Sequence, residues 1–350
     1  MSEYLSSYRG KRVLVTGGAG AIGSRLVRKL CEADAGLVMV LDDLSSGYRW
    51  NLPNQKNMLF VQGDVCDEIK LKRVFFEKPQ VIFHLAAFFA NQNSVDHPES
   101  DLRTNGIGTL RLLEYSLLSR IERFVYASSG CSIYGSSAPL PLKEEFMSMN
   151  LTTPYQITKM LGELYCNFFL NHHELPVVKT RFFNSYGPGE VPGQYRNVIP
   201  NFIYWGLQGR QLPITGTGEE TRDFTYVEDI VDGLLRGGYF KDAIGQEMNL
   251  ASGTETQIKN LAETINSITG NAKGIHYTPR RKWDTKSRLL ASIDRARDLI
   301  GYDPKTRFDD GLKNTITWFK ENWDNIEASA SFMPGMSSAV RVDQSESKKT

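Results

Sequence analysis

Several features that mark particular classes of protein are scarce in this chain of 350 residues, and each shortage narrows its function. There is no basic excess, because 41 Lys and Arg residues face 40 Asp and Glu residues. A protein that binds nucleic acid through its phosphates usually carries an excess of basic residues, so we expect no nucleic-acid partner. The longest apolar run, VIFHLAAFFA, is too short to span a bilayer and contains His84. We therefore expect no membrane partner.

Cysteine and histidine are also scarce. Only four cysteines occur and none forms a C-x-x-C pair, which excludes a disulfide scaffold in a chain of this size. The five histidines are scattered without metal-ligand spacing, so we expect no metal site. The first residues, MSEYLSSYRGK, lack the apolar core of a signal peptide. These features predict a protein with reduced thiols in the cytoplasm.

Strands and helices alternate over the first half of the chain. Apolar runs such as RVLVT, LVMVLD, QVIFHLAA and RFVYASS are bounded by turn residues, which is typical of strands buried on both faces. Helix-length segments such as GSRLVRKLCEA and PYQITKMLGELYCNFFL lie between the strands. The alternation predicts an α/β fold of the Rossmann type, with a doubly wound parallel sheet and right-handed crossovers.

The composition changes after Phe183. Gly and Pro become dense in YGPGEVPGQ, and the predicted elements become shorter. We expect residues 1–183 to form a dinucleotide-binding domain, with 222–245 returning to it. Residues 184–328 are expected to form a smaller, mixed α/β lobe that binds substrate. The polar segment 329–350 is rich in small residues and is predicted to be disordered.

The stretch VTGGAGAIGSRL predicts a phosphate-binding turn. It places Gly17, Gly20 and Gly23 between a strand and a helix, where glycines allow a sharp turn and close backbone approach. The N–H groups of the helix N-terminus would then face a pyrophosphate. The next strand ends at Asp42, where a carboxylate accepts hydrogen bonds from an adenosine ribose and repels a 2′-phosphate. We therefore predict NAD, and not NADP, as the cofactor.

The stretch TTPYQITKMLGE contains a candidate acid–base pair. Tyr155 and Lys159 are spaced i and i+4 and so share one helix face. An adjacent ammonium and an oxidised nicotinamide favour the phenolate, so we expect the pKa of Tyr155 to be lowered. Such a Tyr can take a proton from a hydroxyl as hydride leaves the carbon. The spacing alone is common in helices, and the interpretation depends on the dinucleotide turn upstream.

These motifs, taken together and in order, resemble one family. They are TGGAGAIG, LDDLSSG, GDV, HLAA, NGIGTLRLLE, SSGCSIYG, YQITK, RFFNSYGPG and TRDFTYVEDI. Their order is similar to that of the extended short-chain dehydrogenase/reductases, specifically the NAD-dependent nucleotide-sugar epimerases and dehydratases. The resemblance covers about residues 12–323 and implies an enzyme that acts on a nucleoside-diphosphate sugar.

The resemblance also implies where the cofactor binds. Ala21 and Ile22 would meet the pyrophosphate, and Asp64 and Val65 would flank the adenine. The segment around the adenosine ribose would comprise Asp42, Asp43, Leu44, Ser45, Ser46 and Gly47. The nicotinamide half would be lined by Leu85, Ala86, Ala87, Phe89, Asn105 and Phe183, beside Tyr155 and Lys159.

Further residues would contact the substrate by the same resemblance. Arg222 and Arg288 are expected to clamp the diphosphate, because guanidinium groups donate bidentate hydrogen bonds to phosphate oxygens. The neighbouring Arg280, Arg281 and Lys282 are interpreted as solvated charges. The remaining candidates are Ser94 for the sugar, Asn184 for the diphosphate, Asn197 and Val198 for the base, and Asp284 for the nucleotide ribose.

The motif SSGCSIYG departs from the family pattern at one position. Relatives usually carry Ser or Thr four residues before the turn Tyr, where the hydroxyl bridges the sugar and the catalytic Tyr. Here that position is Gly130. Ser129 and Ser132 are the candidates to supply the hydroxyl, and Ser132 is preferred because its position often faces the sugar in relatives. Direct action of Tyr155 without a bridging hydroxyl is the alternative.

The same motif indicates the reaction. Dehydratases and decarboxylases of the family typically carry an acidic residue at one or both of the next positions, because elimination needs a proton donor and acceptor. This chain has Cys131 and Ser132 there. We therefore predict C4 inversion of a UDP-hexose or UDP-hexuronate through a transient 4-keto sugar. The alternatives are a 4,6-dehydratase or decarboxylase with the same hydride step, and a non-catalytic NAD-binding sensor, which Gly130 would suit.

The helix ITKMLGELYCNFFL carries two adjacent apolar stripes. They are formed by Met160, Leu164 and Phe168, and by Leu161, Tyr165 and Phe169. One stripe can cover the sheet. The other would pack against a partner subunit, as the paired-helix dimers of the family imply, and we expect a homodimer. A wider core within one subunit is the alternative.

Overall fold

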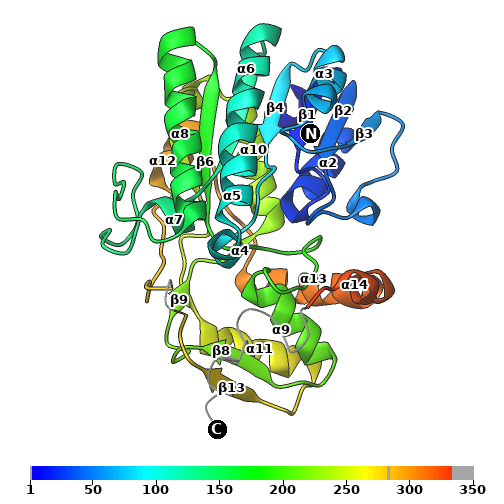
Figure 1. Cartoon of the computed structure of the whole chain (residues 1–350). Helices are drawn as coiled ribbons and strands as arrows, with labels where there is room; N and C mark the ends of the chain where they lie inside the picture. Colours follow the sequence, from blue (N-terminus) through cyan, green and yellow to red (C-terminus); the bar gives the residue numbers. More distant parts are fainter. Residues whose placement is uncertain (1, 282–283, 333–350) are drawn as a thin grey trace.

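The computed structural model describes residues 2–281 and 284–332. Its larger lobe is built on one sheet of seven strands in the order β11-β6-β5-β4-β1-β2-β3 (Figure 1). The strands are β1 (Arg12–Thr16), β2 (Leu37–Asp42), β3 (Met58–Gln62), β4 (Val81–His84), β5 (Arg123–Ser129), β6 (Val177–Phe182) and β11 (Glu247–Leu250). Every neighbouring pair is parallel. The predicted Rossmann-type sheet is confirmed.

Helices cover both faces of this sheet. On one face lie α2 (Ala21–Glu32), α10 (Val227–Tyr239) and α12 (Asp294–Ile300). On the other lie α3 (Glu68–Phe76), the π-helical segment η2 (Leu102–Gly108), α6 (Thr109–Ser119) and α8 (Pro154–His173). Alternate strand residues enter the two cores: Val13 and Val15 pack toward α2 and α10, whereas Leu14 packs toward α3 and α6. The sheet is therefore buried on both sides, which explains its unbroken apolar strands.

Short elements surround the sheet. They are α1 (Glu3–Ser6), η1 (Arg49–Asn51), α4 (Asn91–Asp96), α5 (Pro98–Asp101), α7 (Gly130–Ile133) and η3 (Lys241–Ala243). Two of them, α4 and α7, directly follow β4 and β5 and therefore lie at the carboxyl ends of these strands. In open parallel sheets this edge is where ligands bind.

The smaller lobe lies beyond the carboxyl ends of the strands (Figure 1). It contains the strands β7 (Ser185–Tyr186), β8 (Leu212–Thr215), β9 (Thr221–Arg222), β10 (Thr225–Tyr226), β12 (Thr256–Gln257) and β13 (Ile275–Thr278). Its helices are α9 (Val198–Leu207), α11 (Ile258–Thr269), α13 (Phe308–Glu321) and α14 (Trp323–Ser329). A separate apolar core holds these elements together, with Phe202, Leu261 and Phe319 among its buried members.

The chain crosses between the lobes more than once after Phe183. Helix α10, within the segment 222–245, packs on α2, β5 and β6. Strand β11 then extends the main sheet beside β6, and α12 packs on β11. Besides the segment 222–245, which was expected to return, β11 and α12 of the range 184–328 thus also pack with the main sheet.

The expected disordered tail, 329–350, falls mainly on 333–350, which lie outside the described residues. Before that point the chain is packed: Ser331 forms a bridge with Gly193, and the ring of Phe332 lies 5.7 Å from that of Tyr204. None of the described helices combines the length and the apolar character needed to cross a membrane.

Candidate functional site

A glycine turn joins β1 to α2 and forms a cradle with little room for side chains. A Cβ atom on Gly23 would lie 2.2 Å from the carbonyl oxygen of Gly17, and one on Gly17 would lie 2.6 Å from the Ala86 nitrogen. Gly17 also has φ +68°, which disfavours other residues. The N-cap of α2 is Gly20, whose lack of a side chain leaves the first N–H groups of the helix to a ligand. This geometry fits a pyrophosphate.

The loop after β2 is organised by Asp42. Its two carboxylate oxygens accept hydrogen bonds from the backbone N–H groups of Ala19 and Leu44, each at 2.9 Å. Burial raises the pKa of Asp42, and these two hydrogen bonds oppose that effect. The carboxylate thus joins the glycine turn to the loop expected to hold the ribose.

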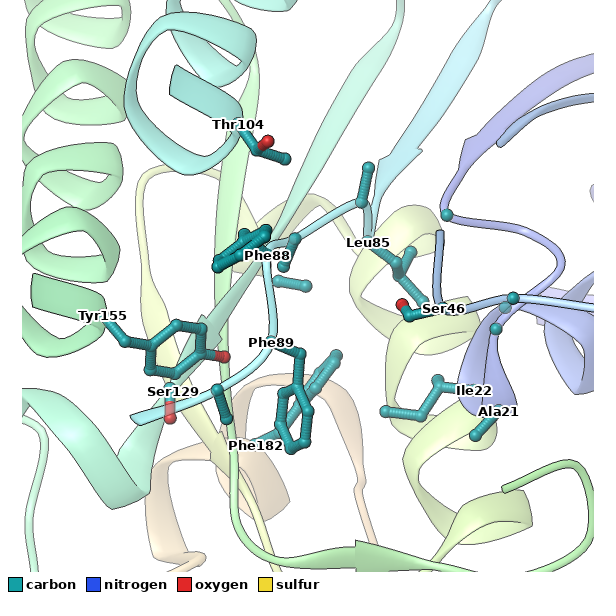
Figure 2. Close-up of a pocket in the computed structure, with 18 of the residues that line it drawn as sticks. Ala21, Ile22, Ser46, Leu85, Phe88, Phe89, Thr104, Ser129, Tyr155 and Phe182 are labelled. Atoms are coloured by element: carbon teal, nitrogen blue, oxygen red, sulfur yellow. The ribbon is translucent and has the colours of Figure 1, made fainter. Parts of the chain in front are cut away.

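These loops open into a cavity of about 550 Å³ along the carboxyl edge of the sheet, the first cavity (Figure 2). Most of the predicted cofactor residues line it. They are Gly17, Gly20, Ala21, Ile22, Gly23, Asp42, Asp43, Ser45, Ser46, Gly47, Asp64, Val65, Leu85, Ala86, Ala87, Phe89, Tyr155, Lys159 and Phe183. Together with the cradle of glycines, this shape and lining fit a dinucleotide.

Two predicted cofactor residues, Leu44 and Asn105, do not line the first cavity. Asn105 is 1% exposed and holds the neighbouring loop instead: its side-chain oxygen accepts the N–H of Phe88 at 2.8 Å. Its amide donates to Asp101 at 2.7 Å. Asn105 therefore supports the cavity wall from behind and is not one of the residues that line it.

Tyr155 and Lys159 lie together near the N-terminus of α8. The Tyr155 hydroxyl is directed into the first cavity beside Phe89 (Figure 2). The Lys159 Nζ lies 5.7 Å from the centre of the Tyr155 ring and donates to the Ala127 carbonyl at 2.9 Å. The helix begins with Thr153 as its N-cap, whose side chain accepts the N–H of Gln156, and with Pro154 in its first turn. This start fixes which face of α8 meets the cavity.

The electrostatics of the pair differ from the expectation. Burial raises the pKa of Tyr155, and the nearby Asp101 carboxylate raises it further, whereas a hydrogen bond with Ser129 lowers it. Burial lowers the pKa of Lys159 to about 8, against the opposing effects of Asp101 and Glu163. The lowering of the Tyr155 pKa was expected from the ammonium together with an oxidised nicotinamide. In the protein alone the direction is upward, because loss of solvent dominates.

The structure accounts for the departure at Gly130. A Cβ atom there would lie 2.0 Å from the Phe183 ring, so the position that carries Ser or Thr in relatives is filled by this ring. Ser129 lies next to Tyr155 (Figure 2), and its Oγ is 2.9 Å from the Oγ of Ser132. Both candidates for the bridging hydroxyl, Ser129 and Ser132, line the first cavity, and Ser132 is fully buried beside Ser129. The preference for Ser132 stays a prediction.

Ser94, predicted to contact the sugar, faces the protein interior. It is fully buried and lies outside the cavities. Its hydroxyl donates to the Asn91 carbonyl at 2.7 Å and accepts the backbone N–H of Tyr155 at 3.1 Å. Ser94 thus anchors α4 to the start of α8 and holds the Tyr155 backbone in place.

A second cavity of about 220 Å³ continues into the small lobe. Both cavities are lined by Phe89, Ala90, Asn91, Cys131, Asn184, Arg196 and Asn197. Of the predicted substrate residues, Asn184, Asn197, Val198, Arg222 and Asp284 line the second cavity. Arg222 is paired with Asp284, with nitrogen–oxygen distances of 3.2 Å.

Arg288 does not reach this cavity. Its side chain is 55% exposed and pairs with Glu255 on the outside of the lobe. Arg281, interpreted above as a solvated charge, lines the cavity in its place, and burial lowers the pKa of its guanidinium.

Three further residues of the cavities were not predicted. Lys286 lines the second cavity, and its Nζ donates to the Cys131 carbonyl. Arg196 donates to the carbonyl of Ser46 and so joins the small lobe to the ribose loop. Glu190 accepts from Asn197 at 2.9 Å, and burial raises its pKa to about 7. No group of three or more His, Cys, Asp or Glu side chains suited to a metal ion occurs within 2–281 and 284–332.

Comparison with known proteins agrees with this geometry. A family model described as the NAD dependent epimerase/dehydratase family matches residues 13–251. The chain is 36% identical over 312 residues to a UDP-glucose 4-epimerase of Mycolicibacterium smegmatis, covering 88% of this chain and 98% of that protein.

Two solved structures are also similar. The epimerase Mth375 of Methanothermobacter thermautotrophicus is 56% identical, with a TM-score of 0.93, over 94% of this chain and 98% of that one. The Bordetella bronchiseptica enzyme WbmF, solved in complex with NAD+ and UDP, is 36% identical. Its TM-score is 0.82, over 92% of this chain and 96% of that one.

Proposed function

The chain belongs to the NAD dependent epimerase/dehydratase family, and we propose that it inverts C4 of a UDP-hexose or UDP-hexuronate. The observation that carries this proposal is the position of the Tyr155 hydroxyl in the first cavity, near its junction with the second. A sugar at this junction places its C4 carbinol against Tyr155 while its nucleotide enters the small lobe. UDP-sugars as substrates are supported by the relatives named above.

The residues at the junction divide the chemistry among them. The glycine turn and the loop after β2 would hold NAD, which would supply the acceptor and donor of the hydride at C4. Tyr155 accepts the proton of the C4 hydroxyl and later returns it. Ser129, hydrogen-bonded to that phenol, orients it toward the sugar. The Lys159 ammonium favours the phenolate and opposes the effect of burial.

Elimination and decarboxylation are disfavoured by the residues that follow Ser129. Position 131 carries a thiol whose pKa is raised by burial, and position 132 carries a hydroxyl that bonds to Ser129. Neither group replaces a carboxylate as a proton donor and acceptor at neutral pH. The test is mass spectrometry of UDP-hexoses and UDP-hexuronates incubated with the protein. We expect an isomer of unchanged mass, whereas a product lacking water or carbon dioxide would refute the proposal.

Activity should decrease at alkaline pH. The Lys159 ammonium has a pKa of about 8, so kcat/KM is expected to fall as the pH rises through that value and the positive charge is lost. Asp101 is ionised there, because its own pKa, raised by burial, is about 6. Since this carboxylate raises the pKa of Lys159, D101N should move the alkaline limb to lower pH. The matched control is D303N at an exposed position, which should leave the pH dependence of kcat/KM unchanged. If D101N also left the alkaline decrease at the same pH, the assignment of that decrease to Lys159 would be contradicted.

The two arginines near Asp284 should differ in their effect on UDP binding. Arg281 lines the second cavity, whereas Arg288 pairs with Glu255 outside it. We expect R281Q to weaken UDP binding by at least about 10-fold, the loss typical for one charge-assisted hydrogen bond. R288Q should change the Kd, measured by titration calorimetry, by less than about 2-fold, as for an exposed ion pair. A larger loss in R288Q than in R281Q would restore the original expectation.

We also propose a homodimer formed by α8 and its neighbours. Helix α8 exposes Ile157, Leu164 and Phe168 at 54%, 52% and 49%, and their spacing places them along one face. On the adjacent helices, η2 exposes Leu102 and Ile107, and α6 exposes Leu118. Because α8 packs against η2 and α6, exposed apolar side chains on these three helices suit a subunit interface.

The dimer proposal predicts that L164E yields monomers. A carboxylate in the middle of this surface would have to be buried without a partner on association. Sedimentation velocity should show a dimer for the parent protein and a monomer for L164E. The control is F76E, which places the same charge at an exposed apolar position on α3 and should remain dimeric. A monomeric parent protein would contradict the proposal.

A further inference from the structure

The mechanism leaves one cation of the second cavity without a role. The Lys286 Nζ is held by the Cys131 carbonyl, 155 residues away in the chain. Among the described residues, no carboxylate lies within ion-pair distance of this ammonium, and Asp284, the nearest in sequence, is engaged with Arg222 and Arg280. Burial lowers the pKa of Lys286 to about 8. Lys286 is partly exposed, and an ammonium with restricted access to water is stabilised by an anion, so this position favours a negatively charged ligand.

The contact with Cys131 places this ammonium beside the sugar. Cys131 lies in α7, two residues after Ser129, and lines both cavities at their junction. A sugar whose C4 reaches Tyr155, and whose diphosphate reaches Arg222 and Arg281, must cross that junction. Lys286 therefore faces the pyranose, while the diphosphate has two guanidinium groups of its own.

Resting on the proposed function, we infer that Lys286 recognises a carboxylate on the sugar, so that the substrates are UDP-hexuronates and not neutral UDP-hexoses. The C6 carboxylate is attached to C5, next to the reacting C4, and is the anion that such a sugar brings to the junction. The hydroxymethyl group of a neutral hexose would leave the ammonium uncompensated. Lys286 is thus a specificity-determining residue, and Arg222 and Arg281 serve every UDP-sugar alike.

The test compares UDP-glucuronate with UDP-glucose, and in parallel their 2-acetamido counterparts, on the full-length protein with NAD. One of these two pairs, with or without the 2-acetamido group, will be turned over faster. Within that pair, the parent protein should have a higher kcat/KM for the hexuronate than for the neutral sugar. K286Q keeps a donor for the Cys131 carbonyl but removes the charge, and should lower kcat/KM for the hexuronate by about 30-fold or more. The neutral sugar should change by less than about 3-fold, as expected for a contact it does not make. K286R should restore part of the loss, and K72Q on the exposed face of α3 should behave like the parent protein.

Calorimetry separates this inference from the proposed function. K286Q should weaken binding of the hexuronate and leave the Kd of UDP alone unchanged, and this readout does not require turnover. If K286Q weakened the binding of UDP alone to the same degree, Lys286 would bind the diphosphate and the inference would be overturned. A parent protein that prefers the neutral sugars would overturn it as well. If Lys286 selects the hexuronate in binding but no sugar is inverted at C4, the inference survives and the proposed function fails.

Discussion

Replacing Tyr155 with Phe should lower kcat by about 10²–10⁴-fold, the range typical of a lost general acid–base group. The substitution removes only the oxygen that points into the first cavity. The ring remains packed edge-on against Phe89, 6.1 Å between centres, and the backbone N–H still donates to Ser94. We therefore expect a folded protein that binds NAD and UDP with unchanged Kd. Product formation by chromatography and binding by calorimetry measure the two effects separately.

The matched control for this substitution is Tyr165→Phe on the same helix. Tyr165 is partly buried against the core beneath α8 and lies outside both cavities. Removing the Tyr165 hydroxyl should leave kcat within about 2-fold of the parent value, as for substitutions away from a functional site. Full activity in Y155F would show that another group handles the C4 proton, and the roles of Ser129 and Lys159 would have to be reassigned.

Replacing Arg181 with Met should destabilise the fold by about 3–5 kcal/mol, the cost typical of removing one partner from a buried ion pair. Arg181 on β6 and Glu163 on α8 are 1% and 2% exposed. Two parallel hydrogen bonds of 3.0 and 2.8 Å join them, and the guanidinium also donates to the Tyr134 hydroxyl and the Glu144 carbonyl. R181M would leave the Glu163 carboxylate buried without its charge partner.

Denaturant unfolding measures this loss, with R73M as the control. Arg73 pairs with Glu77 at the exposed end of α3, and its removal should cost less than about 1 kcal/mol. Replacing Glu163 with Leu in the R181M background should recover part of the stability, because no unpaired charge then remains. An R181M protein as stable as its parent would show that the pair does not hold α8 to the sheet.

The fold could be predicted because its signals are local and agree with one another. The strand Leu37–Asp42 is apolar at every position before its final Asp, a pattern that a sheet covered on both faces requires. Gly17 and Gly23 could be assigned to the turn because the spacing of glycines marks it. The structure gives the reason for these glycines, since other side chains would collide with backbone atoms there. Tyr155 and Lys159 were paired correctly because helical spacing alone brings them together.

Residues in loops and short helices were predicted less well, because sequence does not give the direction of their side chains. Ser94 follows β4, as expected for a residue that contacts the sugar, but its side chain points inward to the backbone of Tyr155. Arg281 and Arg288 lie in one irregular segment, and no periodicity distinguishes the arginine of the cavity from the arginine at the surface. Contacts between distant segments, such as that of Lys286 with Cys131, leave no trace in the local pattern. The burial that raises the pKa of Tyr155 likewise depends on the whole fold.

The central claim is that hydride leaves C4 and returns to the same carbon from the other side. It is tested most directly with UDP-glucuronate and UDP-glucose deuterated at C4, incubated with the protein and NAD and followed by nuclear magnetic resonance and mass spectrometry. The account predicts a C4 epimer that has kept its deuterium and its mass. Loss of the label to solvent, its appearance at C6 with loss of water, or a pentose product would contradict it.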